Sequence, residues 1–415
     1  MTAKENISTS NNSIEQSSLV HPQPTESAWS VFLIFLRLGL TSFGGPVAHL
    51  GYFRDELITR RRWLSEHHYA DLITLCHFLP GPSSSQIGMG LGISQAGYAG
   101  AFAAWLGFTM PSALLLILFA FGISIYQEII PQTALHGLVI VALAVIAQAV
   151  WGMTRSLCPD RPRITIMVAV TCYLLVFPSI WGQIVAMLVA AIIGVILFKP
   201  DTVDHDQPLV VPIGRRQGVI WISLFGILLF ALPLVAKLVP TLSTQLVDSF
   251  YRAGSLVFGG GHVVLPLLQA ETVQHGLLSE EIFLAGYGAA QAVPGPLFTF
   301  AAFLGATISS PSGAFITGML CLIAIFLPSF LLVAGVLPFW EKLRHYHPIR
   351  AALMGVNAAV VGLLLSALYS HAWVDAIQTP KDFALALIAF TALMAWKLPP
   401  WLVVIVGSLL AWLVL

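Results

Sequence analysis

The chain has 415 residues, of which 57% are hydrophobic and only 9% are charged, and its formal net charge is zero. A soluble domain carries about 25% charged residues, so this composition excludes a soluble globular protein and predicts a polytopic membrane protein. The neutral balance of charge argues against a nucleic-acid partner. Strand-type alternation over ~10 residues is missing, so the predicted fold is all-α.

Residues 1–27 are rich in Ser, Asn, Gln and Thr and contain almost no large apolar side chains. This composition predicts a disordered tail, which we place on the cytoplasmic side. A short basic region followed by an apolar core is missing before the first apolar stretch, so we expect no signal peptide.

The predicted first repeat, residues 28–198, opens with apolar arms of about 13–16 residues, shorter than the ~20 that cross a bilayer. The arms form two pairs, 29–43 with 46–58 and 66–79 with 83–95. Because Gly or Pro interrupts each pair, we predict broken helices or re-entrant hairpins that meet near the bilayer midplane. Longer spans are expected at 97–122, 134–154, 164–178 and 183–198.

A polar cytoplasmic linker, 199–217, and an extra span at 218–239 make up the predicted segment 199–240 between the repeats. The predicted second repeat, 241–415, shows the same order of short arms and longer spans. Its arms are expected at 242–258, 262–275, 281–293 and 297–309, and its spans at 312–338, 349–371, 382–396 and 399–415.

The two halves also match residue by residue. The stretch "FLRLGLTSFGGP" (35–46) aligns with "FYRAGSLVFGGG" (250–261), which pairs Arg37 with Arg252 and Gly39 with Gly254. The match continues through a Leu-Ser-Glu triplet, a Pro-Gly-Pro triplet and a Pro-Ser pair in each half. Spacing this regular over roughly 80 residues indicates a duplication.

Two independent arguments predict that the second repeat is inverted. With the extra span, the chain crosses the membrane an odd number of times between the start of the first repeat and the start of the second. Arg54, Arg60, Arg61 and Arg62 lie in the loop 54–66, whereas its counterpart 269–281 has no Lys or Arg. Lys and Arg favour the cytoplasmic side, so the N-terminus and the linker 199–217 are predicted to be cytoplasmic. Inverted repeats with helices broken at corresponding positions indicate a secondary transporter, with its site where the breaks meet.

The candidate site centres on the two Pro-Gly-Pro triplets. Proline ends one helix and suits the first turn of the next, and a helix N-terminus with unpaired N–H groups attracts an anion. The alternative is a plain kink that packs helices. The residues concerned are Pro80, Gly81, Pro82, Ser83, Ser84 and Ser85 in the first half, and Pro294, Gly295, Pro296 and Thr299 in the second.

Arg37 and Arg252 are the predicted charge partners of the anion, because a membrane arginine is costly and its guanidinium forks onto oxyanions. The alternative is structural pairing with Glu56, Glu271 or Asp248. Glycine turns that would let the backbone approach a ligand are expected at Gly44, Gly45, Gly259 and Gly260. Coupling or pairing candidates are Glu56, Glu271, His77 and Asp71. The four cysteines are scattered, so we predict no metal site, no cofactor and no enzyme activity.

The segment "FLRLGLTSFGGPVAHLGYFRDELITRRRWLSEHHYADLITLCHFLPGPSSSQIGMGLG" resembles the N-terminal repeat of the chromate ion transporters. The segments "AGSLVFGGGHVVLPLLQAE" and "QAVPGPLFTFAAFLGA" resemble their second repeat, so the resemblance covers nearly the whole chain beyond residue 27. One departure is Gly261, which stands where the first repeat has Pro46, and we expect the two hairpins to differ in stiffness.

The resemblance implies export of chromate across the bacterial inner membrane and resistance to chromate, with sulfate as a related or competing oxyanion. The alternative function is import or exchange of sulfate or a similar oxyanion at the same site. The expected partners are the oxyanion substrate and the lipid bilayer, and the sequence leaves open whether the protein forms a homodimer.

Overall fold

The computed structural model describes residues 26–126, 132–199, 213–258, 260–343 and 346–415. The predicted tail up to residue 25, most of the polar linker (200–212) and Gly259 lie outside the described residues. The first half forms α1 (Ala28–Thr41), α2 (Gly45–Phe53) with a π-helical continuation (Arg54–Arg60), α3 (Glu66–Phe78), α4 (Ser83–Tyr126), α5 (Gln132–Leu157), α6 (Arg161–Val176) and α7 (Ile180–Leu197).

The second half repeats this order after one additional helix, α8 (Arg215–Leu238). Short 3₁₀ and π turns join several of its helices at 261–263, 297–299, 337–339 and 368–373. The remaining helices are α9 (Leu242–Leu256), α10 (Val264–Thr272), α11 (Glu280–Ala292), α12 (Phe300–Ile308), α13 (Ala314–Val336), α14 (Trp340–Leu343), α15 (His347–Ala367), α16 (Val374–Ala376), α17 (Pro380–Met394) and α18 (Pro400–Val414).

Equivalent residues begin equivalent helices. Ser65 caps α3 by accepting a hydrogen bond from the His68 N–H, and Ser279 caps α11 by accepting one from the Ile282 N–H. A hydroxyl at this position satisfies one of the free donors of a first turn, and the following glutamate favours the positive end of the helix dipole. The matching Leu-Ser-Glu triplets of the two halves are therefore helix start signals.

The short arms fold back on each other as hairpins. The rings of Phe35 in α1 and Phe53 in α2 contact each other at 5.5 Å between centroids. A Cβ on Gly90 of α4 would lie 2.7 Å from a methyl group of Leu72 in α3. In the second half, the Ser249 hydroxyl of α9 donates to Glu271 of α10 at 2.6 Å. The rings of Phe283 in α11 and Phe300 in α12 contact each other at 5.1 Å between centroids. Contacts across all four breaks therefore show hairpins, with the Gly and Pro residues at their tips.

Long apolar helices follow the hairpins. Helix α4 leaves helical geometry at Ala96 and Gly97, where it separates a hairpin arm from a longer span. In the described part of the chain, the helices long and apolar enough to cross a membrane cover Ser83–Ile125, Thr133–Leu157, Arg215–Leu238, Ala314–Phe339 and His347–Ala376. With the hairpins and the shorter apolar helices, they confirm the predicted all-α polytopic membrane fold.

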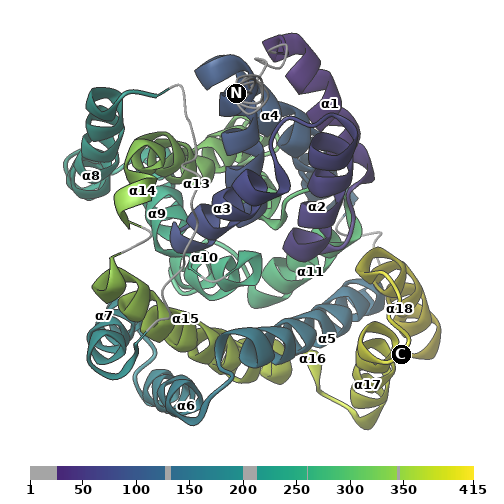
Figure 1. Ribbon diagram of the computed structural model, residues 1–415. Coiled ribbons are helices and arrows are strands. Elements are labelled where there is room, and N and C mark those ends of the chain that lie inside the picture. The colour runs from purple at the N-terminus through teal and green to yellow at the C-terminus, as the bar shows by residue number, and fades with distance from the viewer. Residues whose placement is uncertain (1–25, 127–131, 200–212, 259, 344–345) are drawn as a thin grey trace, which may run out of the picture.

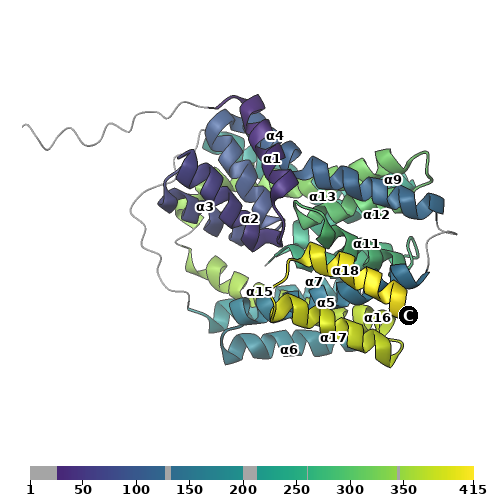
Figure 2. The ribbon, with the colours of Figure 1, turned by 90° about the vertical axis from the view of Figure 1, so that its right-hand side faces the viewer.

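Two layers of helices make up the molecule, and each layer takes helices from both halves (Figures 1 and 2). One layer contains the hairpins and the long helices α4 and α13, with α8 at its edge. The other contains α5, α6 and α7 beside α15, α17 and α18. In this second layer the halves exchange partners, because α5 packs on α17 and α18 whereas α15 packs on α6 and α7.

The equivalent helices α5 and α15 run in opposite directions. His136 at the start of α5 pairs at 3.4 Å with Asp382, which follows the end of the α15–α16 segment. Leu157 at the other end of α5 borders the same cavity as Asn357 at the middle of α15, before the α16 end of that segment. Opposite directions of equivalent helices are what an inverted duplication requires, so the structure agrees with the topology predicted from crossing parity and loop charge.

The hairpin tips lock the two halves together by reciprocal contacts. The Gly81 N–H donates to the Val257 carbonyl at 2.7 Å, and the Gly295 N–H donates to the Ser42 carbonyl at 3.0 Å. A Cβ on Gly81 would lie 2.1 Å from the Ser329 hydroxyl, and one on Gly295 would lie 2.8 Å from the Ser112 hydroxyl. Each Pro-Gly-Pro tip therefore sits against the Pro-Ser pair of the other half's long helix.

Close backbone contacts explain another matched pair of residues. A Cβ on Gly39 of α1 would lie 2.7 Å from the Gly107 carbonyl oxygen of α4, and one on Gly254 of α9 would lie 2.2 Å from that of Ile325 in α13. A side chain at either position would push the two helices apart. The matched glycines thus bring the first arm of each half directly onto its long helix.

Candidate functional site

Two neighbouring cavities lie between the layers, at the place where the hairpin tips meet α5. Cavity 1 has a volume of about 540 Å³ and cavity 2 about 610 Å³. Cavity 1 borders Val145, Gln148 and Ala149 of α5, and cavity 2 borders Ala149 and the following turns up to Leu157. At 1.5 Å per residue, the two cavities follow α5 for about 18 Å.

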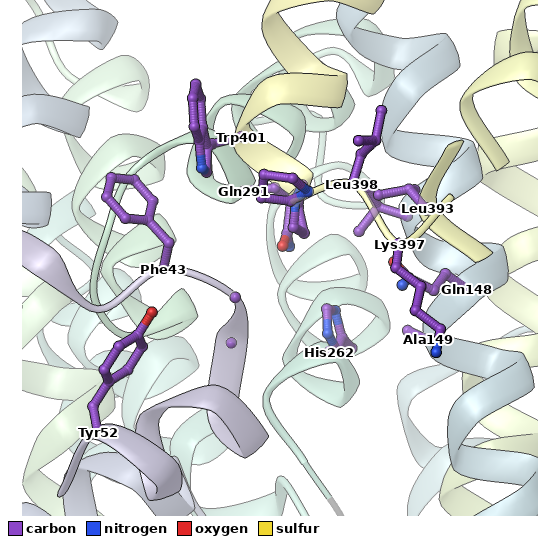
Figure 3. Close-up of a pocket in the computed structure, with 15 residues that line it drawn as sticks. Phe43, Tyr52, Gln148, Ala149, His262, Gln291, Leu393, Lys397, Leu398 and Trp401 are labelled. Carbon is purple, nitrogen blue, oxygen red and sulfur yellow. The ribbon is translucent and has the colours of Figure 1, made fainter. Parts of the chain in front are cut away.

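Cavity 1 combines polar side chains with the N-terminal end of α2. Gly44 precedes this helix with a left-handed φ of 102°, and no side chain caps its free N–H groups. Figure 3 shows Phe43 and Tyr52 on one side of the cavity, Gln148 and Lys397 on the other, and His262 between them. Donor groups thus surround a space that an anion can enter. The remaining lining residues include Gly45, Gln291, Leu393, Leu398, Pro399, Pro400 and Trp401.

Cavity 2 lies beside the first Pro-Gly-Pro tip. Gly81 and Ser83 border it together with His77, and Asn357 of α15 reaches it from the other layer. The Asn357 side-chain oxygen is buried and has no hydrogen-bond partner among the described residues. The lining also includes Cys76, Ser156, Gly260 and Gly261.

The two cavities share Gly44, Ala149 and His262. The Nδ1 atom of His262 lies 2.6 Å from the hydroxyl of Tyr287, a buried residue of α11. This contact fixes the imidazole ring where the cavities meet. A ring held by one nitrogen leaves the other for a further partner, so His262 is a polar group at the border of both cavities.

The serine run after the first tip is buried at the start of α4. Ser83 borders cavity 2, whereas the hydroxyl of Ser85 has no hydrogen-bond partner among the described residues. Ser84 is 3% exposed. The Gln86 amide donates to the Pro80 carbonyl at 2.7 Å and thereby closes the turn that includes Pro82.

The second tip is more closed. The Thr299 hydroxyl donates to the Pro296 carbonyl at 2.7 Å, so it satisfies its own turn. Gly295 borders a small cavity of about 20 Å³ beside His262 and Gln291, and Pro294 precedes it in the same tip. The two tips therefore use their hydroxyl groups differently, because Thr299 is bonded within its own turn whereas Ser85 has no partner among the described residues.

The two matched arginines have different surroundings, and neither borders cavity 1 or cavity 2. Arg252 lies 3.0 Å from Glu271 and 3.3 Å from Asp248, which is the structural pairing considered as the alternative. Arg37 is exposed on the same face of α1 as Leu33 and Leu40. Among the described residues, no ion pair of Arg37 is seen.

The coupling candidates also have separate surroundings. Glu56, the counterpart of Glu271, pairs with Arg60 at 3.0 Å and with Arg61 at 2.9 Å. The equivalent glutamates are therefore neutralised by arginines from different positions, Glu56 by Arg60 and Arg61 and Glu271 by Arg252. Asp71 is buried within α3 at 3% exposure, and His77 near the end of the same helix is exposed toward cavity 2.

Several residues at the cavities had not been predicted from the sequence. Gln148 and Asn357 lie within apolar spans, and a single amide there carries no pattern. Lys397 lies in the turn between α17 and α18, which has no matching lysine in the first half. Only its position, as a basic residue between two apolar spans of the second half, could have marked Lys397 in the sequence.

Broken hairpins, inverted halves and a polar path between two layers define a membrane transporter of the inverted-repeat class. The family model described as chromate transporter matches residues 29–195 and 244–412, one match in each half. The chain therefore belongs to the chromate transporter family.

Relatives resemble the chain over most of its length. A chromate transport protein of Pseudomonas aeruginosa is 30% identical, over 94% of this chain and 93% of the relative. A probable chromate transport protein of Synechococcus elongatus is 27% identical, over 95% of this chain and 98% of the relative. An uncharacterized transporter of Methanocaldococcus jannaschii is 26% identical, over 82% and 83%. No solved structure matches the chain.

Proposed function

We propose that this protein exports chromate, a tetrahedral oxyanion, across the inner membrane of a bacterium and thereby confers resistance to chromate. The observation that carries the proposal is the pair of cavities that meet at Gly44 and His262 between the two layers. They are bordered by the N-terminal ends of α2 and α4, which favour negative charge. The chromate transporter family and the names of the relatives support the substrate.

The direction follows from the charge of the substrate. Moving one charge through 100 mV is worth about 2.3 kcal/mol, so a dianion that leaves an inside-negative cell gains roughly 4.6 kcal/mol per 100 mV by the same figure. Export therefore needs no coupled ion. The arginines at 54–62 favour a cytoplasmic position for this loop, and with it for the N-terminus and the linker 199–217.

The function is tested by chromate accumulation in everted membrane vesicles that contain the protein. In such vesicles an exporter loads the lumen, so we expect chromate loading above that of vesicles without the protein. Competition by unlabelled sulfate measures the selectivity of the site. Loading of sulfate without loading of chromate would contradict the proposed substrate, and loading of neither would contradict the proposed function.

A further inference from the structure

We propose that Lys397 is the charge partner of the oxyanion in cavity 1, an inference that rests on the proposed function. Lys397 is the one Lys or Arg among the described residues that border cavity 1 or cavity 2. Figure 3 shows its side chain extending beside Gln148 and Ala149 of α5. It thus brings a positive charge to the polar side of the cavity, close to where the two cavities meet.

Other elements around cavity 1 supply further donors. The N-terminal end of α2 begins there at Gly45, without a side-chain cap. The Gln291 amide nitrogen is buried and has no hydrogen-bond partner among the described residues. An ammonium, an amide and backbone N–H groups around one space form a set of donors suited to an anion with several oxygen atoms.

The backbone at Lys397 is unusual for a lysine at the rim of a cavity. Its φ is 54°, in the left-handed region that glycine prefers after the end of a helix. In the described chain, Arg62 is the other non-glycine residue with a positive φ. Both residues are exposed, but Lys397 borders cavity 1 whereas Arg62 borders neither cavity. A lysine that occupies a glycine-type position at the rim of a cavity incurs conformational strain that a functional side chain would justify.

The first half lacks an equivalent cation. The corresponding turn between α6 and α7 reads Phe177-Pro178-Ser179, so the positive charge is present on one side of the pseudosymmetric molecule. The turn before α18 therefore differs in charge from the turn before α7, and we place the charge-selective step of transport at cavity 1.

Substitution of Lys397 tests this role without disturbing the turn. In Lys397→Gly the charge is lost and the left-handed backbone is relieved, so the melting temperature should be unchanged or raised. The chromate concentration for half-maximal loading of reconstituted liposomes should rise by about tenfold to a hundredfold, the value of a hydrogen bond to a charged group. Lys397→Arg keeps the charge and should load chromate close to the wild-type level.

Arg62→Gly is the matched control, because it relieves the same backbone conformation and removes a cation outside the cavities. It should load chromate like the wild type. Wild-type half-saturation in Lys397→Gly would overturn the proposal, as would equal losses in Lys397→Gly and Lys397→Arg, which would indicate a structural role.

Binding to the purified full chain separates this inference from the proposed function. Thermal stabilisation by chromate and by sulfate is measured for the wild type and for Lys397→Gly. Stabilisation by sulfate alone, lost in Lys397→Gly, would support the role of Lys397 and contradict the substrate. Stabilisation of both proteins to the same extent would overturn the role of Lys397 whichever oxyanion binds.

Discussion

At the scale of single residues, the glycines of the hairpin tips hold the two halves together. Gly81 has a φ of 123° and Gly295 one of 105°, and each faces a serine of the other half. A side chain there meets both an unfavourable backbone conformation and a neighbouring hydroxyl. The packing of the two halves therefore depends on both tips, and the first tip also borders cavity 2.

The substitution Gly81→Ala should lower the free energy of unfolding by about 2 kcal/mol or more, from backbone strain and overpacking together. Gly295→Ala should cost less, because its Cβ would lie 2.8 Å from a hydroxyl instead of 2.1 Å. The control is Gly122→Ala in α4, where nothing lies within 4 Å of the new Cβ. Thermal unfolding in detergent measures all three, and equal melting temperatures would contradict the structure of the tips.

The ion pairs of Arg252 stabilise the hairpin that α9 and α10 form. Arg252→Ala would leave Glu271 and Asp248, which are 5% and 8% exposed, without their cation. Breaking a buried pair from one side costs about 3–5 kcal/mol, so we expect a large loss of folded protein. Arg54→Ala, which removes an exposed pair with Glu66, should cost less than ~1 kcal/mol. Folded yield and melting temperature distinguish the two.

The exposed position of Arg37 leads to a different expectation from that of its counterpart. Because its side chain stands beside Leu33 and Leu40 outside both cavities, Arg37→Ala should fold normally. Chromate loading by the purified variant then tests the substrate role that the sequence predicted for Arg37. Wild-type loading would mean that Arg37 takes no part in transport. Loss of loading in a well-folded variant would support the predicted role of Arg37 in binding the substrate.

At the scale of elements, the hairpins depend on contacts between their arms. Gly90→Val should destabilise the hairpin of α3 and α4 by about 1–3 kcal/mol through overpacking against Leu72. Leu72→Ala should lower the free energy of unfolding by about 2–5 kcal/mol because it leaves a cavity. The double variant should recover part of both losses, with a coupling energy of about 0.5–3 kcal/mol. Chemical unfolding of the four proteins gives this cycle, and additive losses would mean that the arms do not touch.

The arms, their order and the places of the breaks could be predicted from apolar runs interrupted by Gly and Pro. Whether the arms form hairpins or pairs of crossings could not, because it depends on contacts such as Phe35 with Phe53. The sequence also did not predict which face of each helix is buried. Arg37 and Arg252 align in sequence, yet one shares an exposed face with leucines and the other lies beside two carboxylates.

At the scale of the whole molecule, the two cavities lie at the junction of the two layers, between which the halves exchange helices. The residues that border the cavities include members of α2, α3, α4, α5, α11 and α15 and of the turn before α18. The duplication in the sequence predicted that the breaks meet, and the structure agrees. Lys397 could not be predicted because the matching turn of the first half has no lysine, and Asn357 could not because it is a single amide within an apolar span.

The most direct test is chromate loading of liposomes reconstituted with the purified protein under imposed membrane potentials. Transport of a dianion without a coupled ion predicts that a lumen-positive potential of 100 mV supports a concentration ratio above ~1,000, at about 1.4 kcal/mol per factor of ten. Reversal of the potential should abolish accumulation. Accumulation that does not depend on the membrane potential, or that depends on a proton gradient instead, would contradict electrogenic export of chromate.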